Sequence, residues 1–230
     1  MKLMHPLFSS PVCLKENSIQ TLVVENPAVL RKLAAELLAQ AEGREGEFIL
    51  SAQDHVLDCS AHLNVIHDFF HLQEMEKRLQ TKAISALLKN TQEALAKESF
   101  QLFQSIQEYL GKLAAQAEFP VAYETADNLS ALLKAMDFRV DFSDLPTVEA
   151  LYEHMALINS LLKDQCFVLI HAHAFFSEDE LVQLIHMAHY RKIPLILLES
   201  HAYAPLESEN IRLYDADLCE LTLDEQEKNM

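Results

Sequence analysis

The chain has 230 residues, half of them apolar and 23% charged, which is the composition of a globular protein with one large or two small domains. Its 18 Lys and Arg against 35 Asp and Glu give a formal charge of −17, so bulk charge attracts neither nucleic acid nor an anionic membrane. Only three glycines are present. This excludes the glycine-rich phosphate loops of nucleotide-binding proteins and the nucleophile elbow of α/β-hydrolases.

The cysteines predict neither a disulfide framework nor a structural zinc site, because no two of them form a C-x-x-C pair (Cys13, Cys59, Cys166, Cys219). We therefore expect a reducing, cytoplasmic location. The first residues lack the pattern of a signal peptide, and no run of 18 apolar residues predicts a membrane-spanning helix.

The N-terminal part predicts strands around one helix. Asn26-Pro27 is typical of an N-cap followed by proline at the first helical position, so a helix is expected over 27–41. Strands are expected at 3–8 and 11–14 (a hairpin), 18–24 and 47–51. Residues 54–72 fit both alternation and helical spacing, and periodicity does not decide between them.

The middle of the chain is helical. Residues 73–118 are dense in good helix formers, and their length predicts two helices or one with a break near Asn90-Thr91. Two more helices are expected over 126–136 and 146–163, with an extended piece at 139–142 between them.

The last third predicts a parallel βαβ unit. Residues 166–172 and 193–199 read as buried strands, and Ser177 with Glu180 forms a capping box for the helix between them. Possible edge strands follow at 211–213 and 218–221. The fold class is thus α/β, with a parallel-containing sheet head formed by residues 1–72 and 164–230, and an inserted α-helical leg over residues 73–163.

Histidines raise the possibility of metal chemistry. His67 and His71 would share a helix face, and the same spacing relates Asp54, Asp58 and His62, so a metal-dependent phosphohydrolase is one interpretation. The alternative is that these are polar positions on a half-buried element. His171 and His173 follow a parallel strand, where α/β ligands bind, but with no glycine loop nearby they are better explained as loop-capping or interface residues.

Basic residues form one candidate surface. Arg78, Lys82 and Lys89 lie within about 40° of one another on a helix, a stripe that could follow DNA phosphates or merely solvate an exposed face. Lys134 and Arg139 lie in the later helical region. Such residues gain weight as a DNA site only where several copies converge on one cavity.

Acidic residues gather near the far end of the predicted insertion, at Glu118, Glu124 and Asp127, followed by Asp137, Asp141 and Asp144. They could supply oxygen ligands to calcium or form solvated loops, and no EF-hand pattern is present.

The order of segments resembles the type II-A CRISPR-associated adaptation protein of the Csn family. The residues that show this are the strand Ser18–Asn26, the stretch Cys166–Leu181, Lys192–Glu199, Tyr214–Leu218, and Tyr123-Glu124 followed by Leu129, Leu132, Leu133 and Met136.

The resemblance implies a head with degenerate ATPase-like topology and a homotetrameric ring. The ring would bind ends of double-stranded DNA in a central hole, without catalysis, during spacer acquisition. It also implies calcium near the leg, with Glu118, Glu124 and Asp127 as ligands and Glu149 and Glu153 as further candidates. The implied partners are the CRISPR integrase proteins and the RNA-guided nuclease. Because Ser200–Ala204 has histidine where the family often has arginine, DNA binding should strengthen at lower pH.

Overall fold

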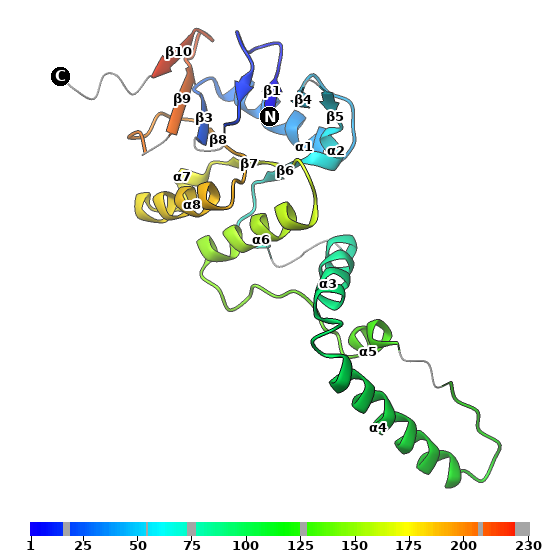
Figure 1. Ribbon diagram of the computed structural model, residues 1–230. Helices are drawn as coiled ribbons and strands as arrows, with labels where there is room; N and C mark the ends of the chain where they lie inside the picture. Colours follow the sequence, from blue (N-terminus) through cyan, green and yellow to red (C-terminus); the bar gives the residue numbers. More distant parts are fainter. Residues whose placement is uncertain (16–18, 54, 73–76, 125–127, 207–208, 224–230) are drawn as a thin grey trace. The chain divides into compact units, whose positions relative to one another are not determined.

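A computed structural model of the chain describes residues 1–15, 19–53, 55–72, 77–124, 128–206 and 209–223. It divides into two compact units (Figure 1). The head unit comprises Met1–Glu74 and Phe142–Met230, and the helical unit comprises Met75–Asp141.

A six-stranded mixed sheet forms the centre of the head unit. Its order is β10-β9-β3-β8-β7-β6, and every neighbouring pair is parallel except β9 and β10. The strands are β3 (Ile19–Val24), β6 (Leu63–Ile66), β7 (Cys166–Ile170), β8 (Leu195–Glu199), β9 (Glu209–Tyr214) and β10 (Glu220–Leu223). All residues of β7 and β8 are buried, as their continuous apolar sequences predict. The α/β fold class is therefore confirmed.

The expectation of an edge strand at 211–213 is wrong, because β9 pairs with β3 on one side and with β10 on the other. Its place inside the sheet follows from long-range pairing with β3, which the sequence pattern does not report. Arg212 donates to the carbonyl of Ser10 at 2.6 Å and lies 3.4 Å from Glu220.

A small antiparallel sheet of order β2-β1-β4-β5 contains the predicted N-terminal hairpin. Its strands are β1 (Lys2–Met4), β2 (Val12–Cys13), β4 (Ile49–Ala52) and β5 (His55–Leu57). The ambiguous segment after position 54 is neither one helix nor one strand: it forms β5, the short helix α2 (Cys59–His62) and β6.

Helices cover both faces of the large sheet (Figure 1). Helix α1 (Pro27–Ala41) packs on one face and shares a buried core with the small sheet, to which Leu33 and Leu37 of the helix and Val168 and Ile196 of the large sheet belong. Helices α6 (Thr147–Leu161) and α8 (Glu178–Tyr190) lie on the other face, and α7 (Ala172–Phe175) is a single turn after β7. The predicted capping box of Ser177 and Glu180 is present.

The helical unit contains α3 (Lys77–Thr91), α4 (Ala96–Ala115) and α5 (Leu129–Ala135), so the predicted break near Asn90-Thr91 is confirmed. Residues 139–142 form no strand. Instead, Gln80 Nε2 donates to the Val140 carbonyl at 3.1 Å, and Val140 N–H donates to Gln80 Oε1 at 2.9 Å. This amide pair fixes the returning chain to α3.

The units differ from the expected domain ranges in one helix. We expected 146–163 in the leg, but α6 belongs to the head unit because Val148, Leu151 and Met155 are buried there and α6 packs against α8. Within the described residues, no helix has both the length and the apolar character needed to cross a bilayer.

Candidate nucleic-acid interface

Helix α3 has four Lys and Arg residues and no Asp or Glu, although the whole chain is strongly acidic. Lys82 is half-buried and Lys89 is exposed, and their seven-residue spacing puts them about 20° apart around the helix. Arg78 lies on the same side by its position, and its side chain is outside what the structure describes. The row from Arg78 to Lys89 spans about 16 Å, or about five base pairs along one DNA strand.

The fourth cation of α3 is Lys77, which sequence reasoning missed. It is exposed and lies about 100° around the helix from Arg78, so it adds charge without extending the row. Among the residues that the structure describes, no carboxylate lies within 4.0 Å of Lys77, Lys82 or Lys89. These charges are therefore available to an external anion. A count of basic residues along the predicted helix could have found Lys77.

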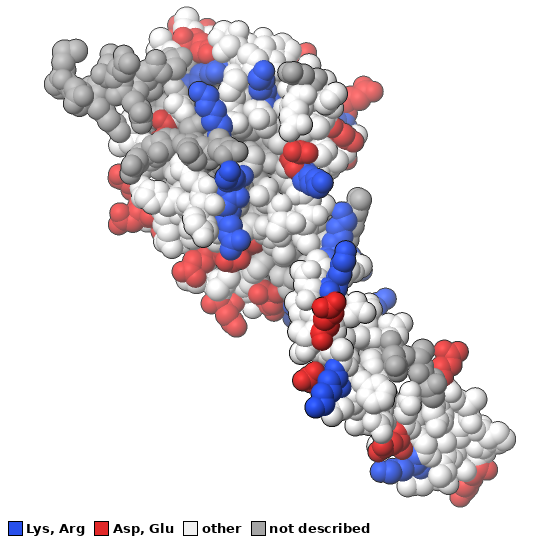
Figure 2. Space-filling model, in the orientation of Figure 1, with Lys and Arg blue, Asp and Glu red and all other residues white. Residues whose placement is uncertain are grey.

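The two units carry very different charges. The head unit has ten Lys and Arg against 26 Asp and Glu, a formal charge of −16, whereas the helical unit has eight against nine, a charge of −1. Figure 2 shows basic side chains over α3 and acidic side chains over α6 and α8. A polyanion is thus repelled less by the helical unit than by the head.

The other two predicted basic residues, Lys134 and Arg139, differ in whether a carboxylate lies close to them. Lys134 is exposed in the last turn of α5, where a cation also interacts favourably with the helix dipole. Arg139 contacts the carboxylate of Asp137 and lies 3.8 Å from that of Asp141. Because its charge is already shared between two carboxylates, Arg139 is a weaker candidate for binding phosphate.

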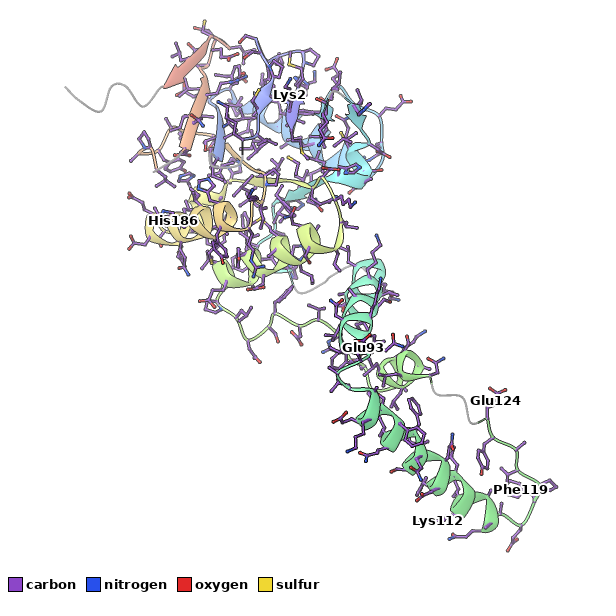
Figure 3. The ribbon with its side chains drawn as sticks, viewed as in Figure 1. Lys2, Glu93, Lys112, Phe119, Glu124 and His186 are labelled. Carbon is purple, nitrogen blue, oxygen red and sulfur yellow. The ribbon has the colours of Figure 1, made fainter. Side chains whose placement is uncertain are left out.

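The predicted calcium ligands do not form a cation site within the described chain. Glu118 and Glu124 are both exposed on the segment after α4, where Figure 3 labels Glu124, and Asp127 lies outside the described residues. The described residues there contain no three ligand atoms within 4.8 Å of one another. Glu149 and Glu153 lie on α6 of the head unit, half-buried and exposed respectively.

Helix α4 is amphipathic but has no buried residue over its 20 positions. Phe100 is 66% exposed and Tyr109 65% exposed, and a cavity of about 830 Å³ lies between apolar side chains of α3, α4 and α5, including Leu95 and Phe103. A helix with an apolar stripe normally buries it, so this unit has a surface suited to association.

The carboxyl edge of the large sheet, where α/β proteins usually bind ligands, is occupied by the chain's own side chains. Asn26 caps α1 after strand β3, and its Oδ1 accepts from the amides of Ala28 at 3.1 Å and Val29 at 3.3 Å. These are amides that a phosphate would need at a helix N-terminus.

Glu199, at the end of β8, is fully buried. Its Oε1 accepts from the backbone N–H of His173 at 3.1 Å and faces the His173 Nδ1 at 3.0 Å, while Nδ1 of His171 lies 3.8 Å from Oε2. The His173 ring stacks on Tyr203 with centroids 4.2 Å apart. The predicted loop-capping role of these histidines agrees with this geometry.

The His and Asp residues of 54–71 do not converge within the described structure. Asp58 caps α2, His62 Nδ1 faces the carbonyls of Lys163 and Asp164, and His71 pairs with Asp68 at 2.6 Å. Asp54 lies outside the described residues. These positions therefore supply no preformed phosphohydrolase centre among the described side chains.

One described group has metal-like spacing: His5, Glu36 and Glu47. The His5 Nε2 lies 3.4 Å from Glu36 and 3.7 Å from Glu47, and the ring is fully buried. However, Nδ1 accepts from the Leu7 N–H at 3.1 Å, so a neutral ring carries its proton on Nε2. A metal needs the lone pair there, and we therefore interpret the group as a polar contact between the hairpin and α1.

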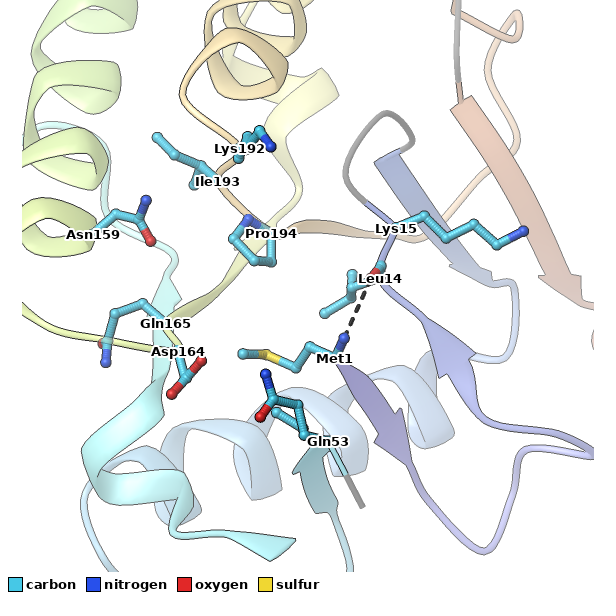
Figure 4. A pocket seen from close by; sticks show the side chains of 11 residues that line it. Met1, Leu14, Lys15, Gln53, Asn159, Asp164, Gln165, Lys192, Ile193 and Pro194 are labelled. Atoms are coloured by element: carbon cyan, nitrogen blue, oxygen red, sulfur yellow. Dashed lines mark hydrogen bonds between the residues drawn. The ribbon is translucent and has the colours of Figure 1, made fainter. Parts of the chain in front are cut away.

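A polar cavity of about 290 Å³ lies at the opposite, amino edge of β7 and β8 (Figure 4). Asn159, Asp164 and Gln53 face the Met1 side chain, whereas Lys15 extends away. The cavity is lined by Lys192 and Met1 as well, but its inward carboxylate disfavours a DNA phosphate, and the row of cations on α3 is the better candidate interface.

Comparison with known families gives one match. A family model described as "CRISPR-associated protein (Cas_Csn2)" matches residues 40–218, which is most of the chain. A search of curated proteins gave no match.

Proposed function

The chain belongs to the Cas_Csn2 family of CRISPR-associated proteins, and we propose that it binds the ends of double-stranded DNA as a homotetrameric ring during acquisition of new spacers.

The observation that favours DNA binding is the row of cations on α3. Lys82 and Lys89 lack carboxylate partners among the described residues, and the unit that holds them is nearly neutral. Contacts from such a row go to phosphates, so binding is independent of sequence and weakens steeply with salt.

Association would compensate for the acidic total. One copy offers only a short cationic row, and its head unit carries a charge of −16, whereas several copies around a duplex would concentrate the potential of their rows in one channel. The unburied apolar side of α4 supports association of the helical units, because that surface gains stability when another chain covers it. A duplex could enter the hole of a closed ring only by one of its own ends.

No catalysis is proposed. The amides at the start of α1 are capped by Asn26, and the buried carboxylate of Glu199 is engaged by His173. Both features support a structural role for the sheet edge.

Calcium is proposed as a ligand of the acidic segment after α4. The described carboxylates of Glu118 and Glu124 do not by themselves form a complete site within one chain. The CRISPR integrase proteins and the RNA-guided nuclease remain proposed partners, on the resemblance alone.

The test is binding of a linear duplex across a range of salt concentrations. Replacing Lys82 and Lys89 with Gln should weaken binding and reduce the slope of log K against log salt by up to about 1.8 per participating chain. The matched control replaces Lys97 and Lys112, which are exposed on α4 of the same unit. Equal effects of the two double substitutions would refute the α3 row.

A further inference from the structure

The head unit exposes two phenylalanine rings just beyond the carboxyl ends of β6 and β7. Phe70 is 69% exposed and Phe175 is 49% exposed, and their centroids lie 5.9 Å apart in an edge-to-face arrangement. Exposed aromatic rings that form a pair are typical of binding surfaces, because scattered single residues carry no comparable contiguous apolar area.

One ring of the exposed pair, that of Phe175, rests on a buried aromatic base. Phe69 is 2% exposed, and its ring lies 5.1 Å from that of Phe175 and 5.0 Å from that of Phe176. The backbone N–H of Phe70 donates to Asp68 Oδ1 at 2.9 Å. These contacts hold the Phe175 ring in place, and the Phe70 ring packs against it, so less conformational entropy is lost when a partner covers the pair.

Carboxylates lie close in the chain to both rings. Asp68 lies two residues before Phe70, and the exposed Glu178 and Asp179 form the first turn of α8, which begins soon after Phe176. His71 and the Phe70 amide, by hydrogen bonding, lower the pKa of Asp68, which therefore stays ionised near neutral pH. Figure 2 shows acidic side chains in the region of α8, whose own carboxylates all lie in its first turn. This charge disfavours DNA and favours a cationic partner.

We propose that Phe70 and Phe175, with the carboxylates of Asp68, Glu178 and Asp179, form a docking site for a protein segment that presents an apolar anchor between Lys or Arg side chains. An aromatic centre within a rim of complementary charge is the usual arrangement of an interaction hot spot. The inference is independent of the proposed DNA binding, because it concerns the acidic head unit rather than α3.

The probe is a short fluorescent peptide with Leu and Phe at its centre and Lys on both sides, and its counterpart has Glu in place of Lys. Fluorescence anisotropy with the full chain should show tighter binding of the Lys peptide. Phe70→Ala and, separately, Phe175→Ala should each weaken that binding by about tenfold or more. Replacing Glu178 with Gln and Asp179 with Asn should reduce both the affinity and its dependence on salt.

The matched control is Tyr190→Ala, since Tyr190 is an 84% exposed aromatic residue at the far end of α8. It should leave peptide binding unchanged. Circular dichroism checks that each variant is folded. Because the two Phe residues are replaced in separate variants, the test still works if one variant does not fold. Three results would overturn the proposal: equal binding of the two peptides, unchanged binding by both Phe variants, or competition by DNA at low concentration. A fall in the solution mass of the Phe variants would also overturn it, because the surface would then belong to a contact between copies.

Discussion

Removing the carboxylate of Glu199 should destabilise the head unit more than any surface change. The side chain is fully buried, and it satisfies two donors of His173, the backbone N–H at 3.1 Å and Nδ1 at 3.0 Å. In Glu199→Ala both donors lose their acceptor, and each buried, unsatisfied donor costs roughly 1–3 kcal/mol. Relief of the desolvated carboxylate offsets part of this, so the expected loss in the free energy of unfolding is about 3 kcal/mol.

Glu199→Gln should cost less, about 1 kcal/mol, because its Oε1 can still accept both hydrogen bonds and only the strengthening by charge is lost. The control is Glu45→Ala, an exposed loop position, where a change below about 0.5 kcal/mol is expected. Urea unfolding followed by circular dichroism measures the free energy of unfolding of each variant, and amide exchange in β7 and β8 reports on the head unit alone. The expected loss is largest for Glu199→Ala, smaller for Glu199→Gln and smallest for the control. If Glu199→Ala unfolds at the same urea concentration as the control variant, the hydrogen bonds of Glu199 do not stabilise the head unit.

Three further predictions concern capping, pH and salt. Asn26→Ala should lower the free energy of unfolding by about 1 kcal/mol in urea titration, because the amides of Ala28 and Val29 lose their acceptor; an unchanged midpoint would contradict the cap. Burial lowers the pKa of His154, so the unfolded chain binds the extra proton first, and stability should fall as pH drops below about 6.5. His154→Phe should flatten this fall in a series of urea titrations, and an identical pH profile would argue against it. In DNA binding, replacing Arg139 with Gln should reduce the salt slope less than replacing Lys89 with Gln, since Asp137 and Asp141 already pair with Arg139; the reverse order would remove the pairing argument.

The sequence correctly predicted those helices and strands that are specified by a short stretch of neighbouring residues. The apolar runs of β7 and β8, the Asn26-Pro27 start of α1 and the Ser177 capping box all specify their structures by short-range chemistry. The break between α3 and α4 followed from helix length alone.

Long-range pairing decided the features that the sequence pattern missed. Strand β9 has a polar face, so its interior position depends on pairing with β3, where Thr21 contacts the buried Glu209. The assignment of α6 to the head unit depends on its packing against α8, which no local signal reports. The segment after position 54 changes element every few residues, which defeats any test of periodicity.

In the candidate site, too, the sequence predicted what local spacing decides and missed what depends on contacts outside a regular helix or strand. The spacing of Arg78, Lys82 and Lys89 predicted one face of α3 from helix geometry. The pairing of Arg139 with Asp137 depends on a turn with Asp137 in the left-handed region (φ 51°), and the sequence gives no sign of it. Likewise, Glu199 and His173 are 26 positions apart and meet only because β7 and β8 are neighbours.

The most direct test of the account compares binding to linear and covalently closed circular DNA of the same sequence and length, at one salt concentration. If a duplex enters the ring by one of its ends, the protein should clearly prefer the linear form, because closed circular DNA has no end. Equal affinity for the two forms would contradict end binding, whatever the contribution of the α3 lysines.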